Sequence, residues 1–128
     1  MIVLALAAAG LAALVHGYIF AMESLLWTSP RTRATFGVAS DDEARHTKPL
    51  AFNQGFYNLF LGLAAALGVV LVPAGAAAVG VTLLVVATGS MLGAALVLAL
   101  SMPALRRAAL VQGLFPLIAL IALGIAAL

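Results

Sequence analysis

The sequence predicts an all-α protein, a bundle of four transmembrane helices that forms one domain over residues 1–128. Hydrophobic residues occupy 66% of the 128 positions and charged residues only 8%, and the mean hydropathy is +1.24. Soluble domains are about 45–50% apolar and about 25% charged, so the composition is that of a membrane protein. Because about 20 apolar residues span a bilayer, the length accommodates four spans and no separate soluble domain.

The first span begins near the N-terminus and could be mistaken for a cleaved signal peptide. No Lys or Arg precedes the apolar run, and the run is longer than a typical signal core. We therefore interpret it as a span. The four spans are expected at residues 2–27, 49–72, 76–101 and 104–127.

The connection over residues 28–48 is the only long one and is expected to hold a short amphipathic helix. Ser40 is a typical N-cap, and Asp41, Asp42 and Glu43 follow it as an acidic first turn with Glu at the third position, the pattern of a capping box. Pro49 is expected at the first turn of the second span, where its missing N–H does no harm.

Glycine and proline mark further features of the spans. Gly89 and Gly93 have the spacing that lets another backbone approach, and we favour packing inside the bundle over contact with a second copy. Gly55 and Gly62 are likewise expected to admit a neighbouring helix. Pro116 is expected to kink the fourth span and to free the carbonyl of Gln112.

Topology follows from the basic residues, which all lie in the first and third connections. Those connections are on one side of the membrane, so the positive-inside rule places both in the cytoplasm and both termini outside. We expect the membrane to be the bacterial cytoplasmic (inner) membrane. Six basic residues do not make a nucleic-acid surface, so no nucleic-acid partner is expected. The expected partner is the lipid bilayer.

Polar side chains gather in the cytoplasmic half of the predicted bundle. Counting 1.5 Å per residue from the span ends places polar groups of three spans within about 6–16 Å of the cytoplasmic edge. Amides and carboxylates in lipid are costly unless partnered. We therefore predict a polar pocket walled by spans one, two and four, with seven candidate ligand-binding residues: His16, Glu23, Asn53, Gln54, Tyr57, Asn58 and Gln112.

His16 and Glu23 are the candidates for acid–base chemistry, because seven residues advance two helical turns and keep both on one face. Each polar residue also has a structural interpretation, since membrane amides often only bond helices together. A metal site fits poorly because the two residues lie two turns apart and no second histidine accompanies them. The absence of cysteine excludes thiolate sites, and no cofactor is expected.

Several stretches together resemble a known family: Trp27-Thr28-Ser29-Pro30, Phe36-Gly37, Asn53-Gln54-Gly55-Phe56-Tyr57-Asn58, and Gln112-Gly113 with Pro116. They are similar to the small four-helix integral membrane proteins grouped as domain of unknown function 1304. The resemblance covers essentially the whole chain. It implies the same architecture and the same site residues, and it implies no activity.

Three functions remain open. The first is binding or transport of a small polar or cationic solute or a lipid headgroup, with Glu23 as counter-ion; transport by so small a bundle would require a homodimer. The second is a membrane-embedded enzyme that uses His16 and Glu23 on a lipid or isoprenoid-like substrate. The third is a structural membrane subunit, in which the polar groups only join helices.

Overall fold

The structure, a computed structural model that describes all residues 1–128, is built from helices and connecting loops without strands. Four helical segments are long and apolar enough to cross a membrane: Ile2–Leu25, Asp41–Leu71, Ala77–Ser101 and Pro103–Ala126. The predicted all-α, four-span fold class is confirmed, and the chain is a multi-pass membrane protein. The side of the membrane on which the termini lie stays a prediction.

The helices follow one another with short connections. In chain order they are α1 (Ile2–Phe20), the π-helix η1 (Ala21–Leu25), α2 (Pro30–Phe36), α3 (Asp41–Leu71), α4 (Ala77–Ser101), the 3-10 helix η2 (Pro103–Leu105) and α5 (Arg106–Ala126).

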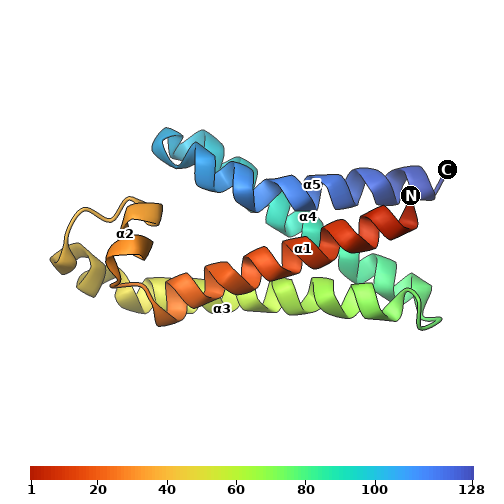
Figure 1. Ribbon diagram of the computed structural model, residues 1–128, viewed down its shortest axis with the longest axis horizontal. Coiled ribbons are helices and arrows are strands. Elements are labelled where there is room, and N and C mark those ends of the chain that lie inside the picture. The colour runs from red at the N-terminus through yellow and green to blue at the C-terminus, as the bar shows by residue number, and fades with distance from the viewer.

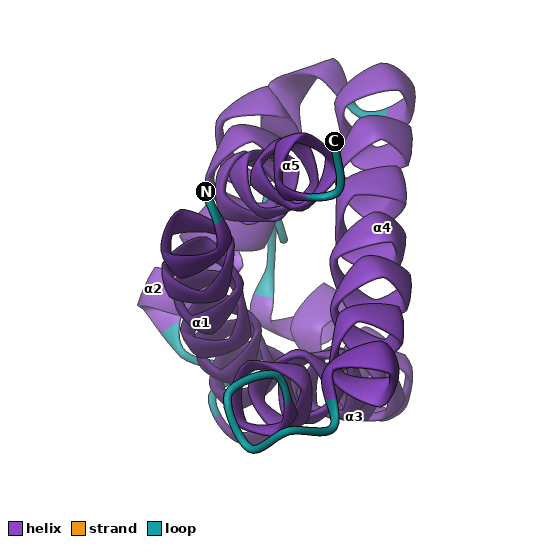
Figure 2. Ribbon diagram, turned by 90° about the vertical axis from the view of Figure 1, so that its right-hand side faces the viewer, coloured by secondary structure: helices purple, strands orange, loops and turns teal.

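The bundle consists of two helix pairs that meet at one end and diverge at the other. α1 packs along α3, and α4 packs along α5. Both termini and the α3–α4 turn lie at one end of the molecule, which we call the termini end (Figure 1). At the opposite end, the connection end, the α1/α3 pair and the α5 helix separate, with α2 between them. Figure 2 looks along the molecule and shows α4 crossing obliquely from the side of α3 to the side of α5, opposite α1.

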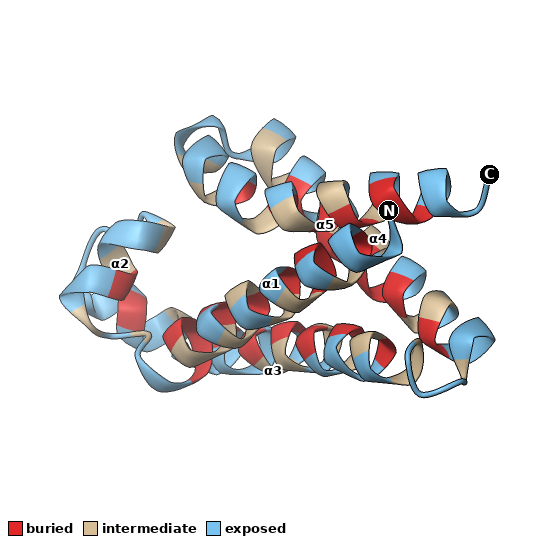
Figure 3. Ribbon diagram, turned by 45° about the vertical axis from the view of Figure 1, so that its right-hand side comes forward, coloured by how far each residue is buried: buried red, intermediate tan, exposed pale blue.

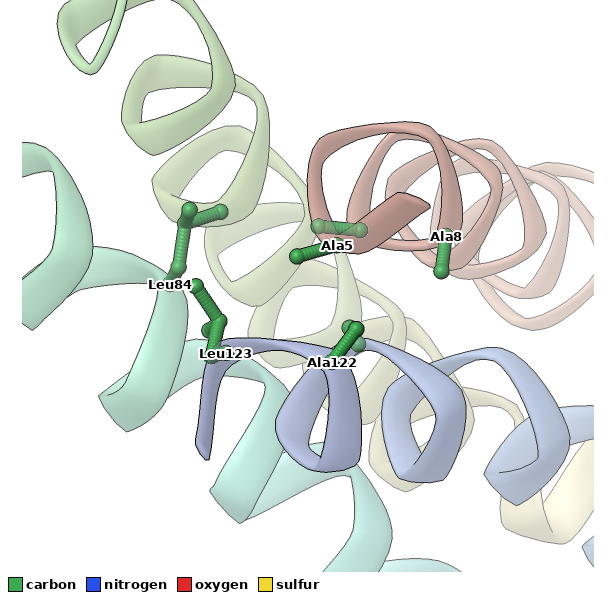
Figure 4. Packing of buried hydrophobic residues seen from close by; sticks show 7 residues of the cluster. Ala5, Ala8, Leu84, Ala122 and Leu123 are labelled. Carbon is green, nitrogen blue, oxygen red and sulfur yellow. The ribbon is translucent and has the colours of Figure 1, made fainter. Parts of the chain in front are cut away.

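Small side chains hold the pairs together at the termini end. The buried cluster there consists of Ala5, Ala8, Ala9, Leu84, Ala119, Ala122 and Leu123, and Figure 4 shows several of them between α1, α4 and α5. In lipid, helices associate through close packing rather than through the hydrophobic effect, and alanine permits that packing. Buried positions follow the facing sides of the helices, and the outward sides are exposed, as lipid-facing surfaces should be (Figure 3).

Glycine sets the closest helix contacts. A Cβ on Gly62 would lie 3.1 Å from the Ala13 carbonyl oxygen, and one on Gly55 would lie 3.1 Å from the Ser24 backbone nitrogen. The prediction that Gly55 and Gly62 admit a neighbouring helix is confirmed. The prediction for Gly89 and Gly93 is wrong: a Cβ on either would meet nothing within 4 Å, because both face away from the other helices.

The helix that contains the second span begins earlier than predicted. α3 starts at Asp41 and runs without interruption through Pro49, so neither a separate helix after Ser40 nor a helix start at Pro49 is correct. Ser40 is confirmed as the N-cap of this helix, since the Glu43 N–H donates to Ser40 Oγ at 3.1 Å, whereas Glu43 Oε2 accepts from the N–H of Ala39, one residue before the cap, at 2.9 Å. A proline removes one helical hydrogen bond, which the long flanking turns tolerate here.

The short helix of this connection is α2, upstream of the predicted one. Ser29 caps it by accepting a hydrogen bond from the Thr32 N–H, Pro30 occupies its first position, and Gly37 ends it with a φ of 70°. An ion pair from Arg33 to Asp41 ties α2 to the start of α3. Trp27 Nε1 donates to Thr47 Oγ1 at 3.0 Å and so fixes the end of η1 against α3. These contacts hold α2 across the connection end.

Candidate functional site

A cavity of about 860 Å³ occupies the space where the two helix pairs diverge. Residues of α1, η1, α2, α3, α4, η2 and α5 line it, and 15 of its 23 lining residues are hydrophobic. On α1 and η1 the lining residues run from Val15 to Glu23, and on α5 they end at Gln112. The cavity therefore reaches from the connection end to about the level of His16.

The polar side chains that line the cavity are called the polar wall, and a buried carboxylate and a buried amide form its centre. Asn58 Nδ2 donates to Glu23 Oε2 at 2.7 Å, across the α3–η1 contact. The two residues are only 8% and 7% exposed. Asn58 Nδ2 also donates to the Gln54 carbonyl at 3.3 Å, which orients the amide. No protein donor bonds Glu23 Oε1, so this oxygen remains free for another partner.

The π-helix places Glu23. The Leu26 N–H donates to the Ala21 carbonyl at 3.0 Å, the wider i to i+5 bond that defines this segment. Ser24 Oγ donates to the Phe52 carbonyl at 2.9 Å, and Gly55 leaves the room for this approach. Single π-turns inside α-helices occur frequently at functional sites. The turn shifts the register of Glu23 relative to an uninterrupted helix, and no residue pattern in the sequence signals it.

His16 lies at the inner end of the cavity and is fully buried. Its Nδ1 donates to the Ala12 carbonyl at 2.9 Å. With the proton on Nδ1, a neutral imidazole has its lone pair on Nε2, and this buried nitrogen has no hydrogen-bond partner. Buried polar atoms without a partner are rare and costly, so Nε2 is an acceptor available to a partner from outside the protein.

The remaining predicted residues divide into two groups. Gln54, Tyr57 and Gln112 line the cavity, and their side chains form no hydrogen bond within the protein. Asn53 is exposed and does not line it, because it lies on another face of α3. The structure thus brings six of the seven candidate residues to one cavity, and their role in binding stays a prediction.

The hydroxyl side chains of α4 are satisfied within their own helix, and Asn53 is a span amide outside the cavity that forms no side-chain hydrogen bond within the protein. Thr82, Thr88, Ser90 and Ser101 each donate to the carbonyl four residues earlier. These hydroxyls need no external partner. Apart from Asn53, the unmet hydrogen-bonding capacity within the spans is therefore concentrated around the cavity.

The cavity also has walls that the sequence interpretation missed. α4 contributes Ala94 and Leu98, and α2 contributes Arg31 and Thr35. α5 contributes Arg107. A signal for α2 was present in Ser29-Pro30 and Gly37, since Ser at the N-cap, Pro at the first position and Gly after the last turn delimit a helix.

A family model described as a protein of unknown function (DUF1304) matches residues 10–124 of the chain. The match includes every residue of the polar wall. Searches of curated proteins and of solved structures gave no match.

Proposed function

We propose that this chain, which belongs to the DUF1304 family of proteins of unknown function, binds an amphipathic lipid in the cavity between its two helix pairs. The observation that carries the proposal is the composition of the cavity. A mostly apolar lining surrounds a buried carboxylate with a free oxygen and a buried imidazole with a free nitrogen. Ligand sites are typically apolar with a few convergent polar groups.

A lipid suits this cavity better than a small solute in water. A small polar solute would leave most of the apolar wall unmatched, whereas an acyl or isoprenoid chain would cover it. The cavity lies where the helix pairs diverge (Figure 1), and a membrane lipid would enter it laterally between them. Glu23 Oε1 would accept a hydrogen bond from a hydroxyl or ammonium group of the ligand.

An enzymatic function is the second candidate, and the free Nε2 of His16 favours it. A neutral imidazole held in one tautomer by a carbonyl is a suitable general base for a hydroxyl or water. Glu23 would then stabilise or orient the group that reacts. This function requires the same bound lipid, so it adds a chemical step to the binding proposal.

Filling the cavity tests the binding proposal without altering a polar group. Ala94 lines the cavity, whereas Val97 on the same helix is exposed on the outer face. We expect Ala94→Phe to lower the amount of lipid retained by the purified protein at least tenfold in native mass spectra, because the ring occupies the ligand's space. Val97→Phe should retain as much as the unmodified chain.

One outcome of the comparison between Ala94→Phe and Val97→Phe would contradict the binding proposal. Equal lipid retention by both variants would mean that the lipid binds on the outer surface, and the proposal would be rejected. Loss of folding in Ala94→Phe would appear as lost helical circular dichroism. In that case Ala108→Phe, which fills the same cavity from α5, replaces it in the comparison.

A further inference from the structure

Arg31 and Arg107 are the two of the six basic residues that line the cavity; Lys48 also forms no ion pair or side-chain hydrogen bond, but it does not line the cavity. Arg33 pairs with Asp41, Arg45 pairs with Asp42, and Arg106 Nε donates to the Ala99 carbonyl at 3.2 Å. Arg31 and Arg107 form no ion pair and no side-chain hydrogen bond within the protein, and both line the cavity. A topology signal requires only positive charge beside the membrane, so it does not account for this placement.

The two guanidinium groups reach the cavity from different elements at the connection end. Arg31 is on α2 and Arg107 is on α5, and a Cβ on Gly37 at the end of α2 would lie 3.7 Å from Leu105 beside α5. The other charged group of the cavity is Glu23, which lies farther inside and already accepts a hydrogen bond from Asn58. The connection end of the cavity is therefore positively charged, and the middle of the cavity offers a hydrogen-bond acceptor.

From this order of groups we infer that the bound lipid is a phospholipid with a single acyl chain, an inference that rests on the proposed function. Guanidinium groups bind phosphate oxygens with charge-assisted and often bidentate hydrogen bonds. The phosphate lies between Arg31 and Arg107, a free glycerol hydroxyl donates to Glu23 Oε1, and the chain extends along the apolar wall beyond it. A diacyl lipid lacks that hydroxyl and carries a second chain.

The position at the membrane edge agrees with this assignment. Basic pockets between transmembrane helices bind anionic headgroups at the membrane surface. A free phosphate ion would gain the arginines but would leave the apolar interior empty, so the lipid source is favoured over a soluble anion.

Four probes separate the parts of the inference: palmitoyl lysophosphatidic acid, monopalmitoylglycerol without phosphate, dipalmitoyl phosphatidic acid without the free hydroxyl, and glycerol 3-phosphate without a chain. Each is titrated by native mass spectrometry against the full chain, the double variant Arg31→Gln/Arg107→Gln, and the control Arg45→Gln/Arg106→Gln. The control removes the same charge at the same end outside the cavity. We expect the cavity variant to bind lysophosphatidic acid at least tenfold more weakly and monopalmitoylglycerol unchanged, and the control to match the unmodified chain.

Each contrary result rejects one part of the inference. Equal binding of lysophosphatidic acid by all three proteins rejects the phosphate site and leaves the lipid cavity intact. Phosphatidic acid that binds the unmodified chain as tightly as lysophosphatidic acid rejects the single-chain assignment. Glycerol 3-phosphate that binds equally well rejects the lipid source. If none of the three lipids binds the unmodified chain, the proposed function itself fails; binding of phosphatidic acid alone rejects only the single-chain assignment.

Discussion

Replacing Glu23 with glutamine is expected to weaken lipid binding by about 10- to 150-fold while leaving the fold intact. The glutamine carbonyl oxygen can still accept the hydrogen bond from Asn58 Nδ2, so the α3–η1 contact persists. The negative charge and the acceptor at Oε1 are lost, because an amide group presents a donor there. Charge-assisted hydrogen bonds contribute about 1.5–3 kcal/mol, which corresponds to about a 10- to 150-fold loss of affinity. Native mass spectra and thermal unfolding in detergent measure the two effects separately.

Glu23→Ala is the companion variant. It removes the partner of Asn58 and leaves the buried amide unsatisfied, so it should lower the free energy of unfolding by about 1–3 kcal/mol in addition to the loss of binding. A structural subunit behaves differently: both variants would then change stability alone, and Glu23→Gln would retain lipid like the unmodified chain. That outcome would favour the third function over the first two.

Gly55→Ala is expected to disrupt the site by moving η1, which carries Glu23, away from α3. A Cβ at this position would lie 2.1 Å from Ser24 Oγ and 3.1 Å from the Glu23 Cβ. The serine must rotate away from the Phe52 carbonyl, and η1 must move from α3, which pulls Glu23 from Asn58. Overpacking of this kind costs about 1–3 kcal/mol. Thermal unfolding and lipid retention should both decrease.

Gly10→Ala is the matched control for this prediction. A Cβ on Gly10 would meet nothing within 4 Å, and Ala is a better helix former than Gly, so the variant should be neutral or more stable by up to about 1 kcal/mol. If the two alanine variants unfolded at the same temperature and retained the same lipid, the close approach of η1 to Gly55 would not matter for the site.

The architecture and most of the cavity wall were predictable because the relevant signals are local and repetitive. Long apolar runs identify spans, and the uniform rise of a helix converts sequence number into depth. His16, Glu23 and Asn58 could thus be expected in the same half of the bundle, at different depths. Depth does not report direction around the helix axis, which is why Asn53 was grouped with its neighbours although it lies on another face of α3.

The parts that could not be predicted depend on contacts between elements. The π-turn at Glu23 has no residue signature, and the outward orientation of Gly89 and Gly93 depends on how α4 rotates against its neighbours. The continuity of α3 through Pro49 is a case in which flanking helix outweighs one missing hydrogen bond. Arg31 lines the cavity because α2 lies across the connection end. The position of α2 in turn depends on the contacts that this connection makes with α3.

The central claim, that a lipid occupies the cavity between the helix pairs, is tested most directly by photocrosslinking. A photoreactive lysophosphatidic acid is attached to the purified full chain, and the labelled peptides are identified by mass spectrometry. We expect labels within residues 15–23, 54–61, 94–98 and 104–112, which contain lining positions of the four long segments. An excess of unlabelled lipid should prevent this labelling. Labels spread over the outer faces, including residues 82–90 of α4, without competition would contradict it.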